Sequence, residues 1–268
     1  MKLGLIGCGF MGEAILNSTL AKGVVAAGDV HVAEINEDRC TLASSKYGVR
    51  TTDDVVAAID GAEVVIFAVK PQEFDRAAHR LEGRFRREQT IISIMAGVPI
   101  EKIARVLSHA AIVRVMPNTA AAVGEGVSVW TTTPEVDDAA REQVGAILRA
   151  LGREVYVEDE KYLDMATALS ASGPGFVYLL LEAFVDAGVH IGFKRDAAEM
   201  LALQMFVGSA KYAEATGKHP AQLRNEVTSP AGTTAAGLII LESAGVRGAI
   251  IDAVEAAYER SRELGAGA

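Results

Sequence analysis

The feature that most constrains the fold is a glycine-rich turn placed directly after the first apolar run. The chain begins MKLGLIGCGFMGEAIL, so Gly7, Gly9 and Gly12 form the pattern GxGxxG between a strand pattern and a helix pattern. Gly7 permits a tight turn, Gly9 admits a pyrophosphate close to the backbone, and Gly12 lets helix and strand pack closely. The pattern therefore predicts a dinucleotide site at the helix N-terminus, with Phe10 and Met11 beside it; a tight turn without ligand is the alternative.

The rest of the N-terminal half alternates strand patterns with helix patterns. The runs DVHVAE, EVVIFAV, TIISIMA, AIVRVMPN, GVSVWTTT and EVYVED are short and rich in β-branched residues, and helical patterns separate most of them. Nearly continuous apolar strands that alternate with helices are typical of a parallel sheet covered on both faces. We therefore expect a Rossmann-type, doubly wound, mostly parallel α/β domain over residues 1–159.

Ligands of open α/β sheets bind beyond the carboxyl ends of the strands, which directs attention to the residues that follow each strand. The segments FAVKP, SIMAG and MPN stand at such ends. They supply the candidate dinucleotide contacts Ala68, Val69, Lys70, Pro71, Ala96, Gly97 and Asn118. Lys70 could equally be a solvated lysine without a ligand.

Glu34 ends the second strand pattern, in VHVAEINEDR. An acidic residue at this position usually accepts hydrogen bonds from the adenosine ribose and repels a 2′-phosphate, which favours NADH over NADPH. Arg39 follows closely and could partly offset that charge. A solvated glutamate at a strand end is the alternative, so the sequence leaves the choice between NADH and NADPH open.

From residue 160 onwards the strand patterns disappear and long helical patterns follow. Gly188, Gly217 and Gly245 stand where helix ends are expected. Segments such as FVYLLLEAFV and MLALQMFV are apolar on more than one face, which about a hundred residues cannot easily bury within one subunit. We therefore expect an all-helical domain over residues 160–268 and a homodimer formed through it.

Composition excludes several classes of partner. The formal net charge is −9 and the isoelectric point about 5.1, so no global field attracts nucleic acid or anionic lipid. No uninterrupted apolar run approaches the roughly 18–20 residues that span a bilayer. The N-terminus lacks a signal-peptide pattern, which predicts a cytoplasmic protein without membrane partners. Two cysteines and five histidines without ligand spacing predict no metal.

The segment TSPAGTT, directly before an apolar helix pattern, admits two interpretations. Its threonines could be ordinary helix caps. Alternatively, the unpaired N–H groups of the first helical turn, with Ser229 and a closely approachable backbone at Gly232, could hold a small anion. Such a cradle would bind a carboxylate without any arginine, which suits an acidic chain.

Several segments together resemble pyrroline-5-carboxylate reductase. They are GLIGCGFMGEAI, FAVKP, VRVMPNTAAAVGEG, LSASGPGFVYLLLEAFVDAGVHIGFKRDAAEMLA and, most specifically, LRNEVTSPAGTTAAGLIILE. The similarity runs from Met1 to about Leu264. The resemblance implies reduction of 1-pyrroline-5-carboxylate to L-proline with NAD(P)H, the last step of proline biosynthesis. It also implies dimers, often assembled into decamers, with active sites between the nucleotide domain of one subunit and the helical domain of its partner.

The resemblance also implies roles for the TSPAGTT residues. Ser229 and the backbone N–H groups of Gly232 and Thr233 would hold the substrate carboxylate, and Thr234 would orient the ring nitrogen as the catalytic residue. Glu34 departs from the family's usual neutral or basic residue, which weakens the expectation of NADPH but not of the reaction. Two alternatives stay open: another imine or carbonyl reductase of the same build, and an inactive dinucleotide-binding regulatory protein.

Overall fold

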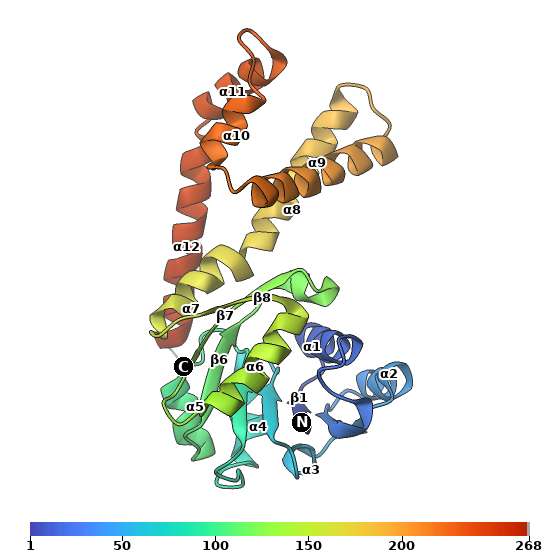
Figure 1. The fold of residues 1–268 in the computed structure, drawn as a ribbon, viewed down its shortest axis with the longest axis vertical. Coiled ribbons are helices and arrows are strands. Elements are labelled where there is room, and N and C mark those ends of the chain that lie inside the picture. Colours follow the sequence, from blue (N-terminus) through green and yellow to red (C-terminus); the bar gives the residue numbers. More distant parts are fainter. Residues whose placement is uncertain (267–268) are drawn as a thin grey trace. The chain divides into compact units, whose positions relative to one another are not determined.

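The computed structural model describes residues 1–266, and these residues form two compact units. Unit 1 comprises residues 1–172 together with 257–266, and unit 2 comprises residues 173–256. The boundary predicted after residue 159 stays a prediction, because compactness and membership of a functional domain are different properties. The elements of both units are labelled in Figure 1.

Unit 1 is built on an eight-stranded sheet with the strand order β3-β2-β1-β4-β5-β6-β7-β8. Neighbouring strands are parallel except β6 and β7, which are antiparallel. The strands are β1 (Leu3–Ile6), β2 (Val30–Ala33), β3 (Arg50–Thr52), β4 (Val64–Phe67), β5 (Thr90–Ser93), β6 (Ile112–Met116), β7 (Gly126–Thr132) and β8 (Gly152–Tyr156). The predicted doubly wound, mostly parallel sheet is confirmed.

Helices cover both faces of this sheet. They are α1 (Phe10–Ala21), α2 (Glu37–Tyr47), α3 (Val55–Ile59), α4 (Phe74–His79), α5 (Ile100–Leu107), α6 (Asp138–Leu151) and α7 (Lys161–Ala166), joined by short 3-10 turns (Ala27–Asp29, Pro71–Glu73 and Thr119–Val123). Side chains of α1, α2 and α6 share one buried apolar cluster with the sheet, and side chains of α3, α4 and α5 share another. The end of α12 (Val246–Ala266) also belongs to unit 1, where it lies beside α7 (Figure 1).

The first strand illustrates why the sheet is buried on both sides. Leu3 and Leu5 enter one apolar cluster and Ile6 enters the other, and all three are almost fully buried. A near-continuous apolar run is the pattern expected of a strand covered on both faces. At Gly4 a side chain would place its Cβ 2.7 Å from the backbone oxygen of Ala58 in α3, so the glycine lets this helix pack directly on the strand.

Unit 2 consists of helices only. They are α8 (Gly173–His190), α9 (Arg195–Thr216), α10 (Pro220–Glu226), α11 (Thr233–Ser243) and the first part of α12. Gly217 and Gly245 adopt the left-handed conformation where helices end, as predicted. The prediction for Gly188 is wrong. It lies inside α8, where a side chain would come within 3.0 Å of Ala198 Cβ, so it is small because α9 packs there.

Unit 2 has a small core and a large exposed apolar surface. Its buried apolar cluster contains only Val185, Ala198 and Ala202. Large apolar side chains are exposed along the helices, including Leu179, Phe184, Met200, Leu203, Ile239, Ile240 and Ile251. An apolar surface of this kind on a folded chain marks an interaction site. This exposure is what a helical unit that packs against another subunit requires.

The exposed helices also form a longer apolar stretch than the sequence analysis expected. Residues Lys161–His190, which run through α7, the π-helical turn Thr167–Ala171 and α8, form a helical segment of 30 residues, with a mean hydropathy of 1.4 over its most apolar window and 11% of that window buried. The helix is long and apolar enough to cross a bilayer by length and composition alone. A face that packs against a protein partner can have the same composition, so the two explanations must be separated by other observations.

Candidate functional site

The glycine turn has the geometry that its sequence predicts. Gly7 has a φ of +89°, and a side chain there would lie 2.9 Å from Val69 Cγ1. At Gly12 a Cβ would lie only 2.3 Å from the Gly7 backbone oxygen, so helix α1 can start this close to β1 only with glycine. Gly9 is the N-cap of α1 and offers no side chain to the free N–H groups of the first turn. The turn therefore presents a helix N-terminus with room for a phosphate.

A cavity of about 860 Å³ lies at this turn, along the carboxyl ends of the strands. Its volume suits an extended organic ligand. Ten of the predicted dinucleotide residues line it, namely Gly7, Gly9, Phe10, Met11, Glu34, Ala68, Val69, Lys70, Pro71 and Ala96. The chain thus brings three separate strand ends and the glycine turn around one space.

Three other predicted residues do not line this cavity. Gly12 lies behind the turn, where it packs α1 against β1. Gly97 faces the end of α12, because a Cβ there would be 3.2 Å from Leu264 Cβ. The side chain of Asn118 accepts a hydrogen bond from Val127 N and donates one to Ser170 O, both at 3.2 Å. The roles assigned to these three residues stay predictions.

Glu34 is buried, and its carboxylate accepts hydrogen bonds from three backbone N–H groups. Its Oε2 accepts a hydrogen bond from Cys8 N at 2.8 Å, and its Oε1 accepts from Ile35 N at 2.9 Å and Asn36 N at 3.0 Å. A carboxylate offers about four acceptor positions, so about one remains for a ligand hydroxyl. Glu34 thus ties together the two loops that border the cavity while keeping a place for one further donor.

Arg39 lies next to this carboxylate on the side of the cavity. Its Nη1 is 3.9 Å from Glu34 Oε2, and its side chain is 54% exposed. A Cβ built on Gly9 would be 3.6 Å from the same nitrogen, which puts the guanidinium over the glycine turn. The position of Arg39 therefore brings an exposed positive charge to a place where a phosphate group could meet it.

The cavity has further polar residues that the sequence analysis did not single out. Arg76 of α4 and Arg80, the C-cap of that helix, line it, and each has a carboxylate partner: Glu73 at 3.7 Å and Asp54 at 2.8 Å. The two arginines are four residues apart, so they lie on one face of the helix that follows FAVKP. The spacing of four residues between the two arginines could have pointed to this cavity from the sequence. Arginines four residues apart are also common on solvated helix faces, so the spacing alone does not identify a ligand site.

The two cysteines near the cavity are poor nucleophiles. Burial, reinforced by the nearby Glu34 carboxylate, raises the pKa of the Cys8 thiol to about 11. Burial raises the pKa of Cys40 as well. Because the thiolate is the reactive form, the geometry does not support a cysteine as the reactive group of this site.

In unit 2 the TSPAGTT segment forms a turn that leads into α11. Gly232 is the N-cap of the helix, and its N–H donates to Ser229 O at 3.0 Å. A Cβ on Gly232 would lie 2.3 Å from Ser229 Oγ, so the serine hydroxyl sits directly over the glycine. Ala231 has a φ of +56°, an uncommon conformation for a residue with a side chain. The turn thus holds a hydroxyl above the beginning of the helix.

No side chain caps α11 at its N-terminus. The sequence alternative, in which the threonines act as ordinary caps, therefore lacks the hydrogen bonds it requires. The N–H groups of Thr233, Thr234 and the next residue have no acceptor within the helix, so they are free to bind an anion. Thr233 is exposed and Thr234 is half-buried.

Across the part of the chain that the structure describes, no three His, Cys, Asp or Glu side chains come close enough together to hold a metal ion. The prediction that the protein needs no metal stays a prediction. The chemistry that the described residues offer is that of hydrogen-bond donors, hydroxyl groups and helix N-termini.

Comparisons with known proteins match two family models to different parts of the chain. The family model "NADP oxidoreductase coenzyme F420-dependent" matches residues 2–97, and the model "Pyrroline-5-carboxylate reductase dimerisation" matches residues 160–264. The first match covers the glycine turn and the strand ends of the cavity. The second covers the exposed helices of unit 2, so a subunit partner accounts for their apolar surface.

Full-length relatives carry one name. A pyrroline-5-carboxylate reductase from Synechocystis is 42% identical over 265 residues, covering 99% of this chain and 98% of the relative. One from Escherichia coli is 34% identical, covering 98% of each chain. The solved structure of a pyrroline-5-carboxylate reductase from Coxiella burnetii has a TM-score of 0.90 at 33% identity and covers 98% of both chains. That of the Plasmodium falciparum enzyme, with NADP bound, has a TM-score of 0.90 at 29% identity. The chain therefore belongs to the pyrroline-5-carboxylate reductase family of NAD(P)H-dependent oxidoreductases.

Proposed function

We propose that the protein reduces 1-pyrroline-5-carboxylate to L-proline, using the cavity of unit 1 for the dinucleotide and the start of α11 for the substrate. The observation that carries the substrate assignment is the uncapped N-terminus of α11, with Ser229 Oγ held over Gly232. This arrangement offers a hydroxyl and free N–H groups at one place, which is what a small carboxylate needs.

The residues of unit 1 fit a nicotinamide dinucleotide. The uncapped first turn of α1 would bind the pyrophosphate, and Glu34 has about one acceptor position left for a ribose hydroxyl. Ala68, Val69 and Ala96 would form the wall along which the ligand extends. When bound, the reduced cofactor supplies the hydride.

The first task of the substrate segment is to hold the carboxylate. Ser229 Oγ and the N–H of Thr233 would donate to it. Gly232 contributes differently from the sequence expectation, because its own N–H already donates to Ser229 O. Its contribution is the absence of a side chain, which leaves the serine hydroxyl and the helix terminus open to the ligand.

Thr234 would orient the ring nitrogen. An imine is basic enough to be partly protonated near neutral pH, and the resulting iminium carbon accepts hydride without a strong acid. The Thr234 hydroxyl therefore needs only to hold the nitrogen and its proton in place while the carbon faces the hydride donor. Thr234 is half-buried at the start of α11, and a β-branched side chain in a helix has few favoured χ1 rotamers, so the choice of hydroxyl positions is small.

For the cofactor, we propose that the protein accepts both NADH and NADPH, with Arg39 as the partner of the 2′-phosphate. Glu34 would repel a phosphate if its charge were free. In the structure its carboxylate is buried, accepts hydrogen bonds from three backbone N–H groups and lies 3.9 Å from Arg39 Nη1. The three N–H donors and the Arg39 guanidinium offset part of the negative charge, so they reduce the repulsion that the sequence alone suggests.

The assembly and the location of the protein are also proposals in part. A dimer through the helical unit follows from the family match, and we propose that dimers associate further, with a decamer as the candidate. We place the protein in the cytoplasm, bound to neither nucleic acid nor membrane, because it matches bacterial pyrroline-5-carboxylate reductases such as those from Synechocystis and Escherichia coli over nearly its full length. Sedimentation of the purified protein without detergent would test the assembly and the absence of a membrane partner.

The reaction is tested by comparing two substrates. Oxidation of the reduced dinucleotide is followed with 1-pyrroline-5-carboxylate and with 1-pyrroline, which lacks the carboxylate. Efficient turnover of the first alone supports the proposal. Equal turnover of both would favour a general imine reductase, since the carboxylate cradle would then be incidental. Tight dinucleotide binding without turnover of either would favour an inactive regulatory protein.

A further inference from the structure

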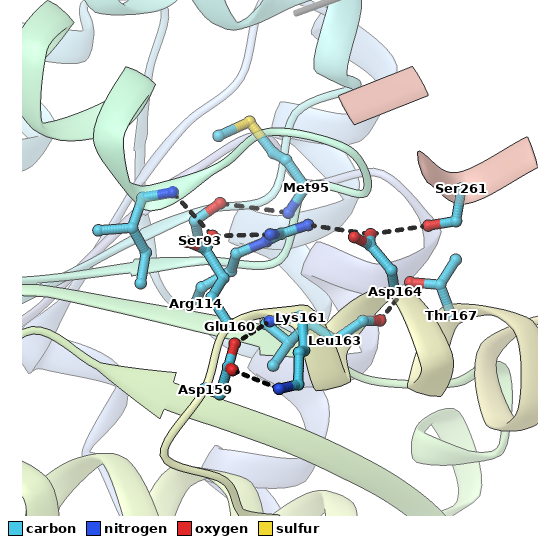
Figure 2. Close-up of polar contacts among 11 residues, drawn as sticks. Ser93, Met95, Arg114, Asp159, Glu160, Lys161, Leu163, Asp164, Thr167 and Ser261 are labelled. Atoms are coloured by element: carbon cyan, nitrogen blue, oxygen red, sulfur yellow. Dashed lines mark hydrogen bonds and ion pairs between the residues drawn. The ribbon is translucent and has the colours of Figure 1, made fainter. Parts of the chain in front are cut away.

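A buried arginine in unit 1 forms a polar cluster outside the dinucleotide cavity. Arg114, on β6, is 3% exposed, and its Nη1 donates to Glu160 Oε1 at 2.7 Å. Its Nη2 lies 3.8 Å from Asp164 Oδ1 on α7. Figure 2 shows the guanidinium with these two acidic side chains around it. A buried charge is costly unless it is paired, so the two carboxylates explain how the arginine is tolerated there.

The same cluster holds the end of α12. Ser261 is 3% exposed, and its hydroxyl donates to Asp164 Oδ1 at 2.9 Å (Figure 2). Asp164 is thus shared between the arginine of the sheet and the serine of the C-terminal helix. All three residues belong to unit 1, so this attachment is part of one compact body.

The end of α12 in turn contacts the loop that follows β5. At Gly97, whose φ is +71°, a Cβ would lie 3.2 Å from Leu264 Cβ and 3.3 Å from the Leu264 backbone carbon. The far end of the loop is held by the cluster itself, because Ile100 N donates to Glu160 Oε1 at 2.8 Å. The loop is therefore held in the middle by α12 and at its end by Glu160.

This loop is also a wall of the dinucleotide cavity. Ile94, Met95 and Ala96, which precede Gly97, all line the cavity. The loop thus has one side against the ligand space and the other against Leu264. A displacement of the helix end would move the cavity wall, because Gly97 and Ala96 are covalently adjacent.

We propose that Ser261 is a positioning residue for the dinucleotide. Through its hydrogen bond to Asp164, which also pairs with Arg114, Ser261 fixes the end of α12. The end of α12 in turn sets the position of the loop Ile94–Gly97, and with it the affinity of the cavity for the dinucleotide. The inference rests on the proposed function, in that it takes the cavity of unit 1 as the dinucleotide site. It assigns a role to the C-terminal helix, none of whose described residues lines the cavity.

The test uses Ser261→Ala in the full-length protein, with Ser128→Ala as the matched control. Ser128 is 1% exposed and its hydroxyl has no hydrogen-bond partner, so the same atom is removed from an equally buried site that does not hold the loop. Losing one hydrogen bond should weaken binding of NADH and NADPH to the free protein by about two- to tenfold. The value of kcat at saturating dinucleotide should stay near that of the wild type, and Ser128→Ala should change neither quantity.

A second measurement follows the loop directly. Hydrogen exchange at the Ile94–Gly97 amides should become faster in Ser261→Ala than in Ser128→Ala, even if the substitution also lowers global stability. An unchanged dinucleotide affinity in folded Ser261→Ala, or equal loop exchange in the two variants, would overturn the proposal. If the wild type itself binds no dinucleotide, the proposed function fails, and the exchange measurement still decides whether Ser261 positions the loop.

Discussion

Replacing Gly232 by alanine should weaken substrate use while leaving the fold and the dinucleotide site intact. The backbone at Gly232 has φ −79° and ψ 170°, which alanine adopts without strain, so the folded state should tolerate the change. The added Cβ would lie 2.3 Å from Ser229 Oγ, so the hydroxyl must leave its position above the helix terminus. The substitution therefore removes one hydrogen-bond donor from the proposed carboxylate site without removing the serine.

The magnitude follows from the kind of bond that is lost. A hydrogen bond to a charged group contributes about 1.5–3 kcal/mol, which corresponds to about 10- to 150-fold in kcat/KM for 1-pyrroline-5-carboxylate. Steady-state oxidation of the reduced dinucleotide measures this ratio. The control is Gly28→Ala, since Gly28 has open space around its Cβ position and lies in the other unit.

A double mutant tests the reasoning itself. In Ser229→Ala/Gly232→Ala the clashing hydroxyl is gone, so the second substitution should add little to the effect of Ser229→Ala alone. Fully additive effects would show that Gly232 acts by another route. A Gly232→Ala enzyme with unchanged kcat/KM would show that the position of the Ser229 hydroxyl is irrelevant to substrate binding.

Four further predictions concern other parts of the site and the fold. Thr234→Val should lower kcat by about tenfold or more with unchanged dinucleotide affinity, and an unchanged kcat would remove this hydroxyl from the mechanism. Arg39→Ala should raise the dissociation constant for NADPH by about tenfold and that for NADH by less than about twofold, measured by direct titration. The Cys8 thiol has an ordinary pKa of 9.0 and a pKa of about 11 in the fold, so it ionises in the unfolded chain first and the free energy of unfolding falls as the pH rises between these values. Cys8→Ala should make the decrease in the free energy of unfolding between pH 9 and pH 11 smaller by about 2–3 kcal/mol, as measured by denaturant titration below and above this pH range. An identical decrease in both proteins would show that ionisation of Cys8 is not its cause. Ile240→Glu, on the exposed apolar face of α11, should shift the protein toward monomer in sedimentation.

The parts of the fold that local patterns specify were predictable. The parallel sheet follows from apolar strands that alternate with helices. The turn at Gly7 follows from the glycine spacing, because only glycine readily adopts its φ of +89° between a strand and a helix packed this closely. The glycine turn and each single strand or helix pattern lie within about a dozen residues, where sequence and conformation are directly linked, and the sheet is predicted from the order of these patterns.

Side-chain direction at the strand ends was not predictable in the same way. The strand-end rule correctly places Ala68 and Ala96 at the cavity, yet it says nothing of where Asn118 points. The amide of Asn118 bonds Val127 N and Ser170 O, and neither partner can be found from local sequence. Gly97 likewise faces Leu264, which is distant in the chain.

Glycines in helical regions show a related difficulty. Gly188 resembles a helix end in the sequence, but it lies inside α8 because Ala198 packs against it. The left-handed glycine after that helix is Gly192. A small residue needed for helix packing and a small residue needed for a turn have the same letter, and only the tertiary contact distinguishes them.

The most direct test of the central claim is transfer of a labelled hydride into the product. The protein is incubated with 1-pyrroline-5-carboxylate and reduced dinucleotide that carries deuterium at the transferable position, and the proline formed is analysed by chiral chromatography and mass spectrometry. The account predicts L-proline that contains one deuterium at the former imine carbon. Folded protein that binds the dinucleotide but yields no labelled proline, with either NADH or NADPH, would contradict it.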